Sequence, residues 1–217
     1  MELARLREAC AALPLFPLPG TALMPGSLLP LHVFEPRYRQ LVTDCLRDGG
    51  PLSVPQLRAD AVDALGRPAY YGYASVGTIG AHQELDDGRF NVLVQPLARI
   101  RIVDEAASTR LYRVARAEVL TDIPHTPRHL ERVGERVRAL FRPLVGRMGE
   151  LGDGVARALQ ALPAERVPEA LAGIVLRQDH ARQAWLADDD PVTRASRVEE
   201  AVLTLLAEVA TSTPAEA

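Results

Sequence analysis

The stretch LPLHVFEPRYRQLV, residues 29–42, joins an apolar strand directly to a helix. Glu35-Pro36 marks the start of the helix, because proline is favoured at the first helical position, where its missing N–H is no loss. Gly49-Gly50 marks its end. Between these signals the apolar side chains recur at the spacing of one helix face, at Tyr38, Leu41, Val42 and Cys45. The pattern predicts a strand, a sharp corner and an amphipathic helix.

The composition of the whole chain is that of a globular protein. Its 217 residues fit one large domain or two small ones, and a formal net charge of -3 gives no general attraction to nucleic acid. No apolar run approaches the roughly 18–20 residues that cross a bilayer. Charged residues interrupt the N-terminal segment, which therefore does not resemble a signal peptide. We expect a cytoplasmic protein without membrane contact.

Two features of the composition exclude several kinds of chemistry. The chain contains no lysine, so all 25 basic residues are arginine. Without lysine there is no P-loop lysine, no Schiff base and no Ser-Lys dyad, and arginine stays protonated and cannot act as a general base. The two cysteines, Cys10 and Cys45, form no CxxC pair, so neither a disulfide framework nor a cysteine-rich zinc site is predicted.

Residues 51–120 carry strand signals. Arginine and isoleucine alternate through RIRI, residues 99–102, as they do in a strand with one buried face. Asp86-Asp87-Gly88 between two apolar runs predicts a hairpin turn. Short strands separated by turns favour a mixed, mostly antiparallel sheet that closes into a pseudo-barrel, with one inserted helix.

The signals change at TDIP, residues 121–124, where strand patterns end and helical ones begin. Helices are predicted over 127–147, 153–162, 165–187 and 191–210. Asp188-Asp189-Asp190-Pro191 predicts the start of the last helix, since acidic caps and proline favour a helix N-terminus. The sequence thus predicts an α+β fold in two domains, a β domain over 1–121 and a helical bundle over 122–217.

No metal or cofactor site is predicted. His125 and His129 have the i, i+4 spacing of paired ligands, but Pro127 lies between them and no HExxH pattern is present. We interpret them as solvated residues near the domain boundary. A metal-dependent enzyme that used both histidines and nearby carboxylates stays an alternative, and tight stoichiometric metal binding would support it.

A second alternative is binding of RNA or DNA. Arginines on two predicted strands, near several aromatic residues, could contact phosphates and stack on bases. Acidic residues are interleaved with them, however, and alternating arginine is typical of any strand that faces solvent. The arginines concerned are Arg99, Arg101, Arg110, Arg113 and Arg116.

Four blocks of the sequence resemble the Lon N-terminal domain family, the substrate-recognition module at the front of the ATP-dependent protease Lon. They are LPLFPLPGTALMPGSLLPLHVFEPRYRQLV (13–42), VGTIG (76–80), LDDGRFNVLVQPLARIRIV (85–103) and YRVARAEVL (112–120). Their order and spacing agree with the family, and the helical remainder matches in kind. Gln95-Pro96 departs from the pattern, because the family usually has a glycine-containing turn there.

The resemblance implies a PUA-like pseudo-barrel followed by a helical bundle. It also implies that this chain is not an enzyme, since the ATPase and the Ser-Lys protease of Lon lie further along that chain. The expected ligands are unfolded or extended polypeptide segments, and a separate protease or chaperone is the expected recipient. Pairing along a proline-interrupted strand edge is one expected mode of binding. The resemblance leaves a homodimer open.

Within this family, the opening stretch is interpreted as a structural corner made of Pro30, Phe34, Glu35, Pro36 and Tyr38. The prolines fix backbone angles, Phe34 and Tyr38 anchor the helix on the sheet, and the Glu35 carboxylate accepts hydrogen bonds from the first free helical N–H groups. Loss of this cap predicts that Glu35→Ala costs about 1–2 kcal/mol of stability. The candidate peptide contacts are large side chains in irregular or strand-edge segments: Phe16, Leu18, Met24, Tyr71, Tyr73 and Phe90.

Overall fold

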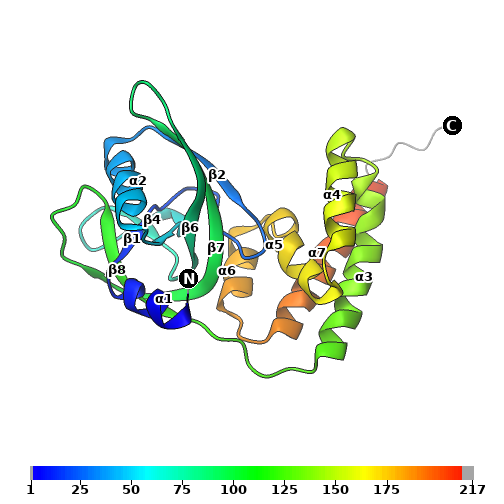
Figure 1. Cartoon of the computed structure of the whole chain (residues 1–217). Coiled ribbons are helices and arrows are strands. Elements are labelled where there is room, and N and C mark those ends of the chain that lie inside the picture. The colour runs from blue at the N-terminus through cyan, green and yellow to red at the C-terminus, as the bar shows by residue number, and fades with distance from the viewer. Residues whose placement is uncertain (1, 212–217) are drawn as a thin grey trace. The chain divides into compact units, whose positions relative to one another are not determined.

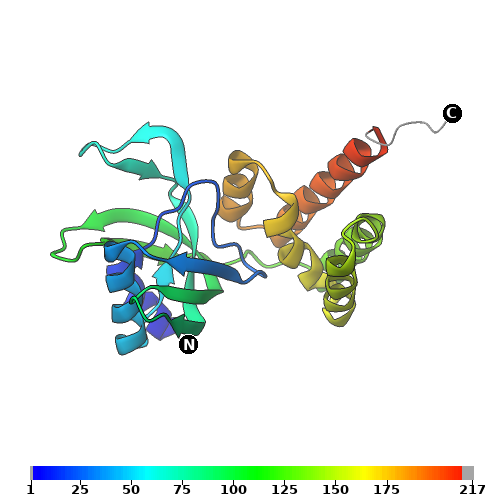
Figure 2. The same cartoon turned by 90° about the horizontal axis from the view of Figure 1, so that it is seen from above.

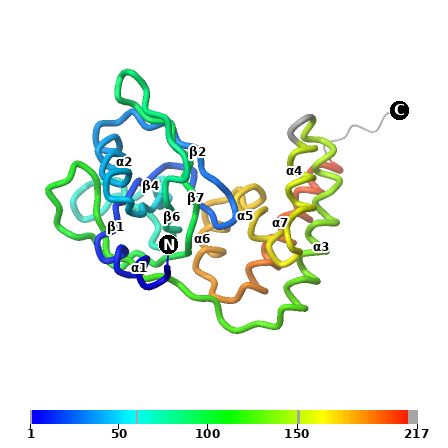
Figure 3. The backbone as a smooth tube through the Cα atoms, viewed as in Figure 1, coloured from blue at the N-terminus to red at the C-terminus, as the bar shows by residue number. Residues whose placement is uncertain are grey.

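A computed structural model describes residues 2–211, with the side chains at 60, 150 and 151 excepted. The chain divides into two compact units, Met1–Thr121 and Asp122–Ala217, and the backbone passes between them once (Figure 3). In the described part of the chain, unit 1 holds all the strands and unit 2 is built from helices. The structure confirms the predicted α+β class.

Unit 1 is a pseudo-barrel with an inserted helix, as predicted. The main sheet has the order β2-β7-β6-β3-β1-β8, and β7 also pairs with β8, so five strands close into a ring while β2 lies outside it on β7. β4 and β5 form a separate hairpin. In chain order the elements are α1 (Leu3–Ala9), a 3-10 turn (η1, Cys10–Ala12), β1 (Leu13–Leu15), β2 (Leu29–Val33), α2 (Pro36–Asp48), β3 (Leu52–Ser53), β4 (Leu57–Val62), β5 (Pro68–Tyr70), β6 (Tyr73–Glu84), β7 (Phe90–Ala106) and β8 (Arg113–Val119).

The 17-residue strand β7 organises the barrel (Figure 1). Its first part pairs with β2, its second part pairs with β8, and β6 pairs with both parts. The predicted hairpin at its start is confirmed: Gly88 N–H donates to the Leu85 carbonyl, and Gly88 has a φ of 75°. Antiparallel neighbours on both sides bury alternate side chains of β7, which explains the period-two pattern in its sequence.

Gln95-Pro96 forms part of a bulge inside β7 rather than a turn. The register with β6 shifts here, because Gly77 pairs with Pro96 and Val76 pairs with Ala98. Proline has no N–H to donate to a ladder, so a bulge is one of the few places where a strand accepts it. Gly77 permits the close approach, since a Cβ there would lie 2.6 Å from the Gln95 carbonyl oxygen.

The corner between β2 and α2 differs from its prediction in two residues. The Glu35 carboxylate makes no capping hydrogen bond, and it accepts instead from Arg37 Nε at 2.9 Å. An adjacent guanidinium competes successfully for the carboxylate, so the predicted cap is wrong. Phe34 is 60% exposed and does not anchor the helix. Tyr38 is buried, stacks on Phe16 with ring centroids 3.9 Å apart and donates from its hydroxyl to the Pro17 carbonyl at 3.2 Å.

The bounds of α2 agree with the sequence. Pro36 occupies its first turn and Gly49, with a φ of 61°, ends it. The left-handed conformation at Gly49 suits a residue without a Cβ. The apolar face of the helix joins a core that also contains β2, β7 and Tyr112. Its buried members from α2 are Tyr38, Leu41, Val42 and Cys45.

Unit 2 contains α3 (Pro127–Val145), α4 (Glu150–Ala161), a 3-10 turn (η2, Ala164–Arg166), α5 (Val167–Val175), α6 (Asp179–Ala187) and α7 (Pro191–Thr211). α3 packs on α7 and on η2, and α4 lies beside α3 (Figures 1 and 2). Gly134 is required where α3 meets η2, because a Cβ there would lie 1.8 Å from the Ala164 carbonyl oxygen. The prediction of a single helix over 165–187 is wrong, because this segment contains η2, α5 and α6 as separate elements.

That segment is broken into η2, α5 and α6 by a side chain that takes over backbone hydrogen bonds. Arg182 Nη1 donates to the carbonyls of Leu176 and Arg177 at 3.0 and 3.1 Å. The carbonyls of the link between α5 and α6 therefore have partners without a further helical turn. The predicted start of the last helix is confirmed, because Asp190 Oδ1 accepts from Val192 N–H at 3.0 Å and Oδ2 accepts from the Thr193 hydroxyl at 2.7 Å.

A buried arginine fastens the beginning of unit 2 to its last helix. Arg194 is 5% exposed. Its two terminal nitrogens donate to the two carboxylate oxygens of Asp122 at 2.9 and 2.8 Å, and Nη1 also donates to the Asp188 carbonyl at 2.9 Å. The guanidinium lies 5.2 Å from the ring centre of Trp185, whose Nε1–H donates to the Arg194 carbonyl at 3.1 Å.

Candidate functional site

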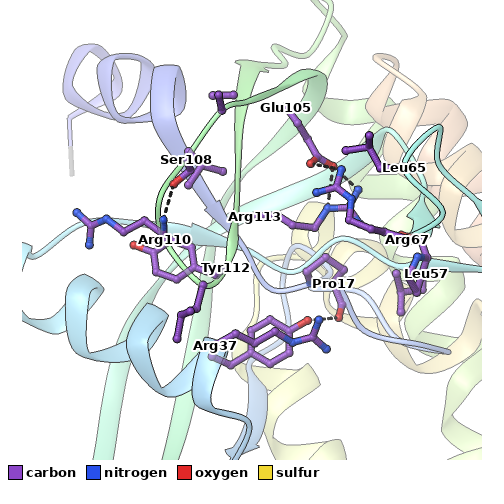
Figure 4. Close-up of a pocket in the computed structure, with 16 residues that line it drawn as sticks. Pro17, Arg37, Leu57, Leu65, Arg67, Glu105, Ser108, Arg110, Tyr112 and Arg113 are labelled. Atoms are coloured by element: carbon purple, nitrogen blue, oxygen red, sulfur yellow. Dashed lines mark hydrogen bonds and ion pairs between the residues drawn. The ribbon is translucent and has the colours of Figure 1, made fainter.

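A half-enclosed cavity of about 480 Å³ lies in unit 1, between the start of α2, the β4–β5 hairpin and the segment that joins β7 to β8 (Figure 4). We call it the α2–β8 pocket. Its lining combines apolar side chains with guanidinium groups, including Pro17, Leu57, Tyr112, Arg37, Arg67 and Arg113.

One wall of the α2–β8 pocket is a cluster of two arginines and two carboxylates. Arg113 donates from Nε to Glu105 Oε1 at 2.8 Å and from Nη2 to Asp63 Oδ2 at 3.0 Å, and its Nη2 also contacts Glu105. Arg67 donates from Nη2 to Glu105 Oε2 at 2.8 Å and from Nε to Asp63 Oδ2 at 2.8 Å. Each acid therefore has both arginines as partners. We call these four residues with Tyr70 the Arg113 cluster.

The Arg113 cluster is positioned by backbone and ring contacts. Arg113 Nη1 donates to the Pro68 carbonyl at 2.7 Å, and its guanidinium lies 4.5 Å from the ring centre of Tyr70. The Tyr70 hydroxyl donates to Glu105 Oε1 at 2.8 Å. Because Pro68 and Tyr70 belong to β5, these contacts tie the β4–β5 hairpin to the barrel strands β7 and β8.

Both carboxylates of this cluster have a pKa below its ordinary value. Burial raises the pKa of Glu105, but hydrogen bonds from Arg113 and Tyr70 outweigh burial and hold the pKa below its usual value. Burial also raises the pKa of Asp63, but hydrogen bonds from Arg67 outweigh burial and hold this pKa below its usual value. The pKa of Tyr70 is raised by burial and by its hydrogen bond to Glu105.

A second carboxylate holds the segment between β7 and β8 against α2. Asp44 accepts from the Tyr112 hydroxyl at 2.9 Å and forms an ion pair with Arg110. Gln40 Oε1 accepts from the Leu111 N–H at 2.8 Å. In Figure 4 Arg110 extends away from Arg113. Burial and the bond to Asp44 raise the pKa of Tyr112 to about 12.

The opposite wall of the α2–β8 pocket contains Arg37. Its side chain is 52% exposed and its Nη2 lies 2.6 Å from the Glu35 carboxylate. The guanidinium lies 4.5 Å from the ring centre of Tyr38, and Figure 4 shows Arg37 directed toward Pro17. Contact with a ring that is itself fixed in the core limits the positions open to the guanidinium.

The sequence-predicted peptide contacts do not line this pocket. Phe16, Met24 and Phe90 are buried at 4%, 3% and 5% exposure, so their side chains offer no surface to a ligand, and we remove them from the candidate surface. Leu18, Tyr71 and Tyr73 are partly exposed, outside the pocket. These residues are large side chains in irregular or strand-edge segments, and large apolar side chains are more often core.

Sequence reasoning did not bring the charged residues of the pocket together, and it named Arg110 and Arg113 only as possible nucleic-acid contacts. Arg67 lies 38 residues before Glu105 and further before Arg113, and strand pairing and the β4–β5 hairpin bring the three together. One usable signal was present: DALGR, residues 63–67, places an acid and an arginine at opposite ends of a turn that contains glycine.

A second surface of unit 1 follows the strand β2. β2 lies at the end of the main sheet, and within residues 2–211 it pairs only with β7. Two large apolar side chains flank it, Leu28 at 54% exposure and Phe34 at 60%. His32 Nδ1 lies 2.7 Å from Asn91 Oδ1, which fixes the outward face of the strand pair. We call β2 with Leu28 and Phe34 the β2 edge.

The described residues contain neither a clustered metal site nor a membrane-spanning helix. No group of three histidine, cysteine, aspartate or glutamate side chains is placed to hold a metal ion there, and His125 and His129 belong to no such group. None of the helices described over residues 2–211 has the length and apolar character that a bilayer span requires.

Comparison with known proteins defines the class to which this fold and these surfaces belong. A family model described as the ATP-dependent protease La (LON) substrate-binding domain matches residues 12–204. The chain belongs to this family. It is 30% identical over 202 residues to a protein named Lon protease 2 from Sorangium cellulosum, covering 91% of this chain and 24% of that protein. A Lon protease 2 from Myxococcus xanthus is 28% identical over 152 residues, covering 69% of this chain and 18% of that protein. The chain thus spans about a quarter or less of the length of these relatives.

Solved structures show the same fold. The N-terminal domain of the Mycobacterium avium complex Lon protease superimposes with a TM-score of 0.69 at 12% identity, covering 88% of this chain and 98% of that one. A Lon N-terminal domain protein from Xanthomonas campestris gives a TM-score of 0.60 at 26% identity, covering 87% and 97%. The match extends over both units in the length covered, so the helical unit is part of the shared architecture.

Proposed function

We propose that this chain is a non-catalytic module that binds unfolded or extended polypeptide segments in the cytoplasm and presents them to a separate protease or chaperone. The observation that carries the proposal is the β2 edge. Membership of a substrate-binding family supplies the class of ligand, and the β2 edge supplies a surface with the chemistry that such a ligand needs.

An extended polypeptide needs backbone partners and pockets or contacts for alternate side chains. β2 is hydrogen-bonded to β7 along one side in the described chain, which leaves its other side as a sheet edge. Pro30 lies within it and removes one donor, which limits how far an added strand can continue. Leu28 and Phe34 offer apolar contact at the two ends of the edge.

The absence of catalysis is supported by composition. The sequence has no lysine, so it carries neither a phosphate-binding P-loop lysine nor a Ser-Lys pair. The family model that matches residues 12–204 of this chain is described as a substrate-binding domain. Both observations favour a binding role over a chemical one.

Nucleic-acid binding finds no support in the arginines that suggested it. Arg99 is 5% exposed. The other four form ion pairs with acids of unit 1: Arg101 with Glu118, Arg110 with Asp44, Arg113 with Glu105 and Arg116 with Asp104. Paired and buried guanidinium groups give little net attraction to phosphate, so we keep polypeptide as the ligand.

The proposal is tested by binding of the full chain to a reduced, carboxymethylated globular protein, which is permanently unfolded, with the same protein in its folded form as a control. The double variant L28S/F34S removes the apolar side chains of the β2 edge. The matched control I174S/L203S removes two side chains of unit 2 with exposures of 47% and 48%. All four side chains are exposed, so neither variant is expected to unfold.

We expect L28S/F34S to lower affinity for the unfolded protein at least tenfold at both low and high salt, while I174S/L203S binds as the original chain does. Binding that vanishes at high salt would contradict the proposal, because apolar and backbone contacts are little screened. If L28S/F34S binds the unfolded protein as tightly as I174S/L203S does, the ligand does not bind at the β2 edge.

A further inference from the structure

We propose that the α2–β8 pocket binds the C-terminal residue of a polypeptide, with the free carboxylate on Arg37 and an apolar side chain against the pocket wall. This proposal rests on the proposed function, because it names the part of a polypeptide that one site of the module recognises. Four observations on unit 1 support it.

The pocket presents guanidinium groups to its interior, and its one lining acid is already saturated. Arg37, Arg67 and Arg113 line it, whereas the guanidinium of the lining residue Arg110 is turned toward Asp44, and Glu105 is the acidic residue among the lining residues described. Glu105 accepts from Arg113, Arg67 and Tyr70. Both carboxylate oxygens of Glu105 therefore have donors, so the charge of this acid is compensated within the protein. An anionic ligand matches this arrangement.

Arg37 is the guanidinium that is placed to receive the anion. It pairs with Glu35 through Nε and Nη2 at 2.9 and 2.6 Å, and its third nitrogen, Nη1, has no protein partner within residues 2–211. Glu35 is itself 39% exposed, so a ligand carboxylate can share the guanidinium with it or displace it at small cost. The planar guanidinium also matches the two oxygens of a carboxylate.

The position of Arg37 is fixed before a ligand arrives. Its guanidinium lies over the Tyr38 ring, and that ring is held by stacking on Phe16 and by a hydrogen bond to the Pro17 carbonyl. A preorganised donor costs less entropy on binding than a free side chain. No comparable support holds an arginine such as Arg101, which pairs with Glu118 on the neighbouring strand.

The remaining walls suit an apolar side chain. Pro17, Leu57 and Leu65 line the pocket, and Leu65 is 75% exposed at the turn of the β4–β5 hairpin. A volume of about 480 Å³ is in the range of about 300–1,000 Å³ that holds small ligands. The segments 63–67 and 106–112 enclose it on two sides, which favours a chain end over a segment that must pass through. Capture of a terminal carboxylate is an established mode of peptide recognition.

The test uses a fluorescein-labelled hexapeptide, Gly-Ser-Gly-Ser-Ala-Leu, as the free acid and as the C-terminal amide. A third peptide, the amide of Gly-Ser-Glu-Ser-Ala-Leu, carries its carboxylate on an internal side chain. Affinity for the full chain is measured by fluorescence polarisation. The variant is Arg37→Gln, and the matched control is Arg101→Gln, because Arg101 has a similar exposure of 48% and the same ion-pair distance of 2.6 Å outside the pocket.

We expect the free acid to bind at least tenfold more tightly than either amide, Arg37→Gln to remove most of that preference and Arg101→Gln to keep it. Equal binding of the free acid and its amide would overturn the C-terminal proposal. The proposed function would still hold if the chain binds the carboxymethylated, unfolded protein. A preference for the internal glutamate peptide would overturn it in favour of acidic side chains. If the original chain binds neither the peptides nor the unfolded protein, the proposed function itself is refuted.

Discussion

Two arginines, Arg113 in unit 1 and Arg194 in unit 2, use the same chemical device for different purposes. Each guanidinium lies on an aromatic ring, at 4.5 Å from Tyr70 and at 5.2 Å from Trp185. Each also pairs with carboxylate and donates to a backbone carbonyl. Arg113 shares its acids with a second arginine, Arg67, and borders a cavity, whereas Arg194 is 5% exposed in the helical unit.

The groups in contact are nearly the same at the two sites. The sites differ in the number of arginines that share the acids and in whether the arginine borders a cavity. When one arginine of the Arg113 cluster is lost, each acid still has the other arginine as a partner. Arg194 has no second arginine beside it, so its loss removes at once the bidentate partner of Asp122, a donor to the Asp188 carbonyl and the cation beside Trp185.

The two units carry separate natural reporters, which makes the comparison measurable. Trp185 is the one tryptophan of the sequence and is 1% exposed in unit 2. Cys10 and Cys45 are the two cysteines and are buried in unit 1. Tryptophan fluorescence therefore follows the unfolding of unit 2. Alkylation of the thiols in a short pulse, counted by mass spectrometry, follows the unfolding of unit 1.

The largest effect is expected from alkaline pH, which should destabilise unit 1 alone. Burial raises the pKa of Cys10 to about 11 and, with the nearby acids Asp44 and Asp48, raises that of Cys45 to about 12. Burial also raises the pKa of Tyr38, Tyr70 and Tyr112. A raised folded-state pKa gives stability that is complete below the ordinary pKa and is lost as pH rises through the folded value. The loss should fall between about pH 9 and pH 12.

Unit 2 should show no such loss, because residues 122–217 contain no tyrosine, cysteine or lysine and arginine stays protonated in this range. Urea unfolding at pH 8 and pH 10.5 checks the prediction. The midpoint from thiol alkylation should fall, and the midpoint from Trp185 fluorescence should hold. A parallel fall of both midpoints would show that the units unfold together.

Arg194→Met should produce the next largest effect. The variant keeps most of the aliphatic stem but removes the guanidinium, so Asp122 loses a bidentate partner and the ring of Trp185 loses its cation. We expect unit 2 to lose about 3 kcal/mol of stability, because three hydrogen bonds of a buried guanidinium are lost at about 1 kcal/mol each, while the Asp122 carboxylate, 41% exposed, stays solvated. Urea unfolding followed by Trp185 fluorescence measures it. An unchanged midpoint would mean that packing alone holds this end of unit 2.

Arg113→Met should cost less, about 2 kcal/mol, because Arg67 remains as an ion-pair partner of both Asp63 and Glu105. The double variant Arg67→Met/Arg113→Met should then cost more than the sum of the single variants, since both acids lose every arginine of the cluster. Thiol alkylation in urea reports the stability of unit 1. Additive costs would contradict the redundancy on which the comparison depends.

Glu35→Ala should have the smallest effect, about 0.5 kcal/mol or less, because the carboxylate forms an exposed ion pair with Arg37 and caps no helical N–H. This replaces the larger cost expected from the sequence. The unfolding midpoint of unit 1 checks it. A loss of 1–2 kcal/mol would restore the carboxylate as a cap.

The sequence predicted the elements that depend on local chemistry. Pro36 and Gly49 bound α2, Gly88 turns the hairpin and Asp190 caps α7, and in each case a backbone requirement is met by a residue nearby in the chain. The sequence could not predict the break between α5 and α6. That break depends on Arg182 turning back to the carbonyls of Leu176 and Arg177, a competition that periodicity does not register.

The candidate site was less predictable because its residues meet only after the sheet has formed. Glu105 and Arg113 lie on neighbouring strands, and Asp63 and Arg67 reach them from the β4–β5 hairpin. The exposure of Phe34 had a different cause. An aromatic residue beside a helix start is usually buried, and here Tyr38 takes the core position and leaves Phe34 at the surface.

The closure of the barrel by β1 and β8 also sets how unit 1 resists mechanical force. Leu13 pairs with Ala115 and Leu15 with Arg113, so the start of β1 lies toward the end of β8. Val119, at that end, pairs with Ile100 of β7 in the same antiparallel sense. A pull transmitted to Leu13 and Val119 therefore loads the hydrogen-bonded pairs one after another, as a zipper opens. Unit 1 should yield to a small stretching force, even though its equilibrium stability depends on all the pairs at once.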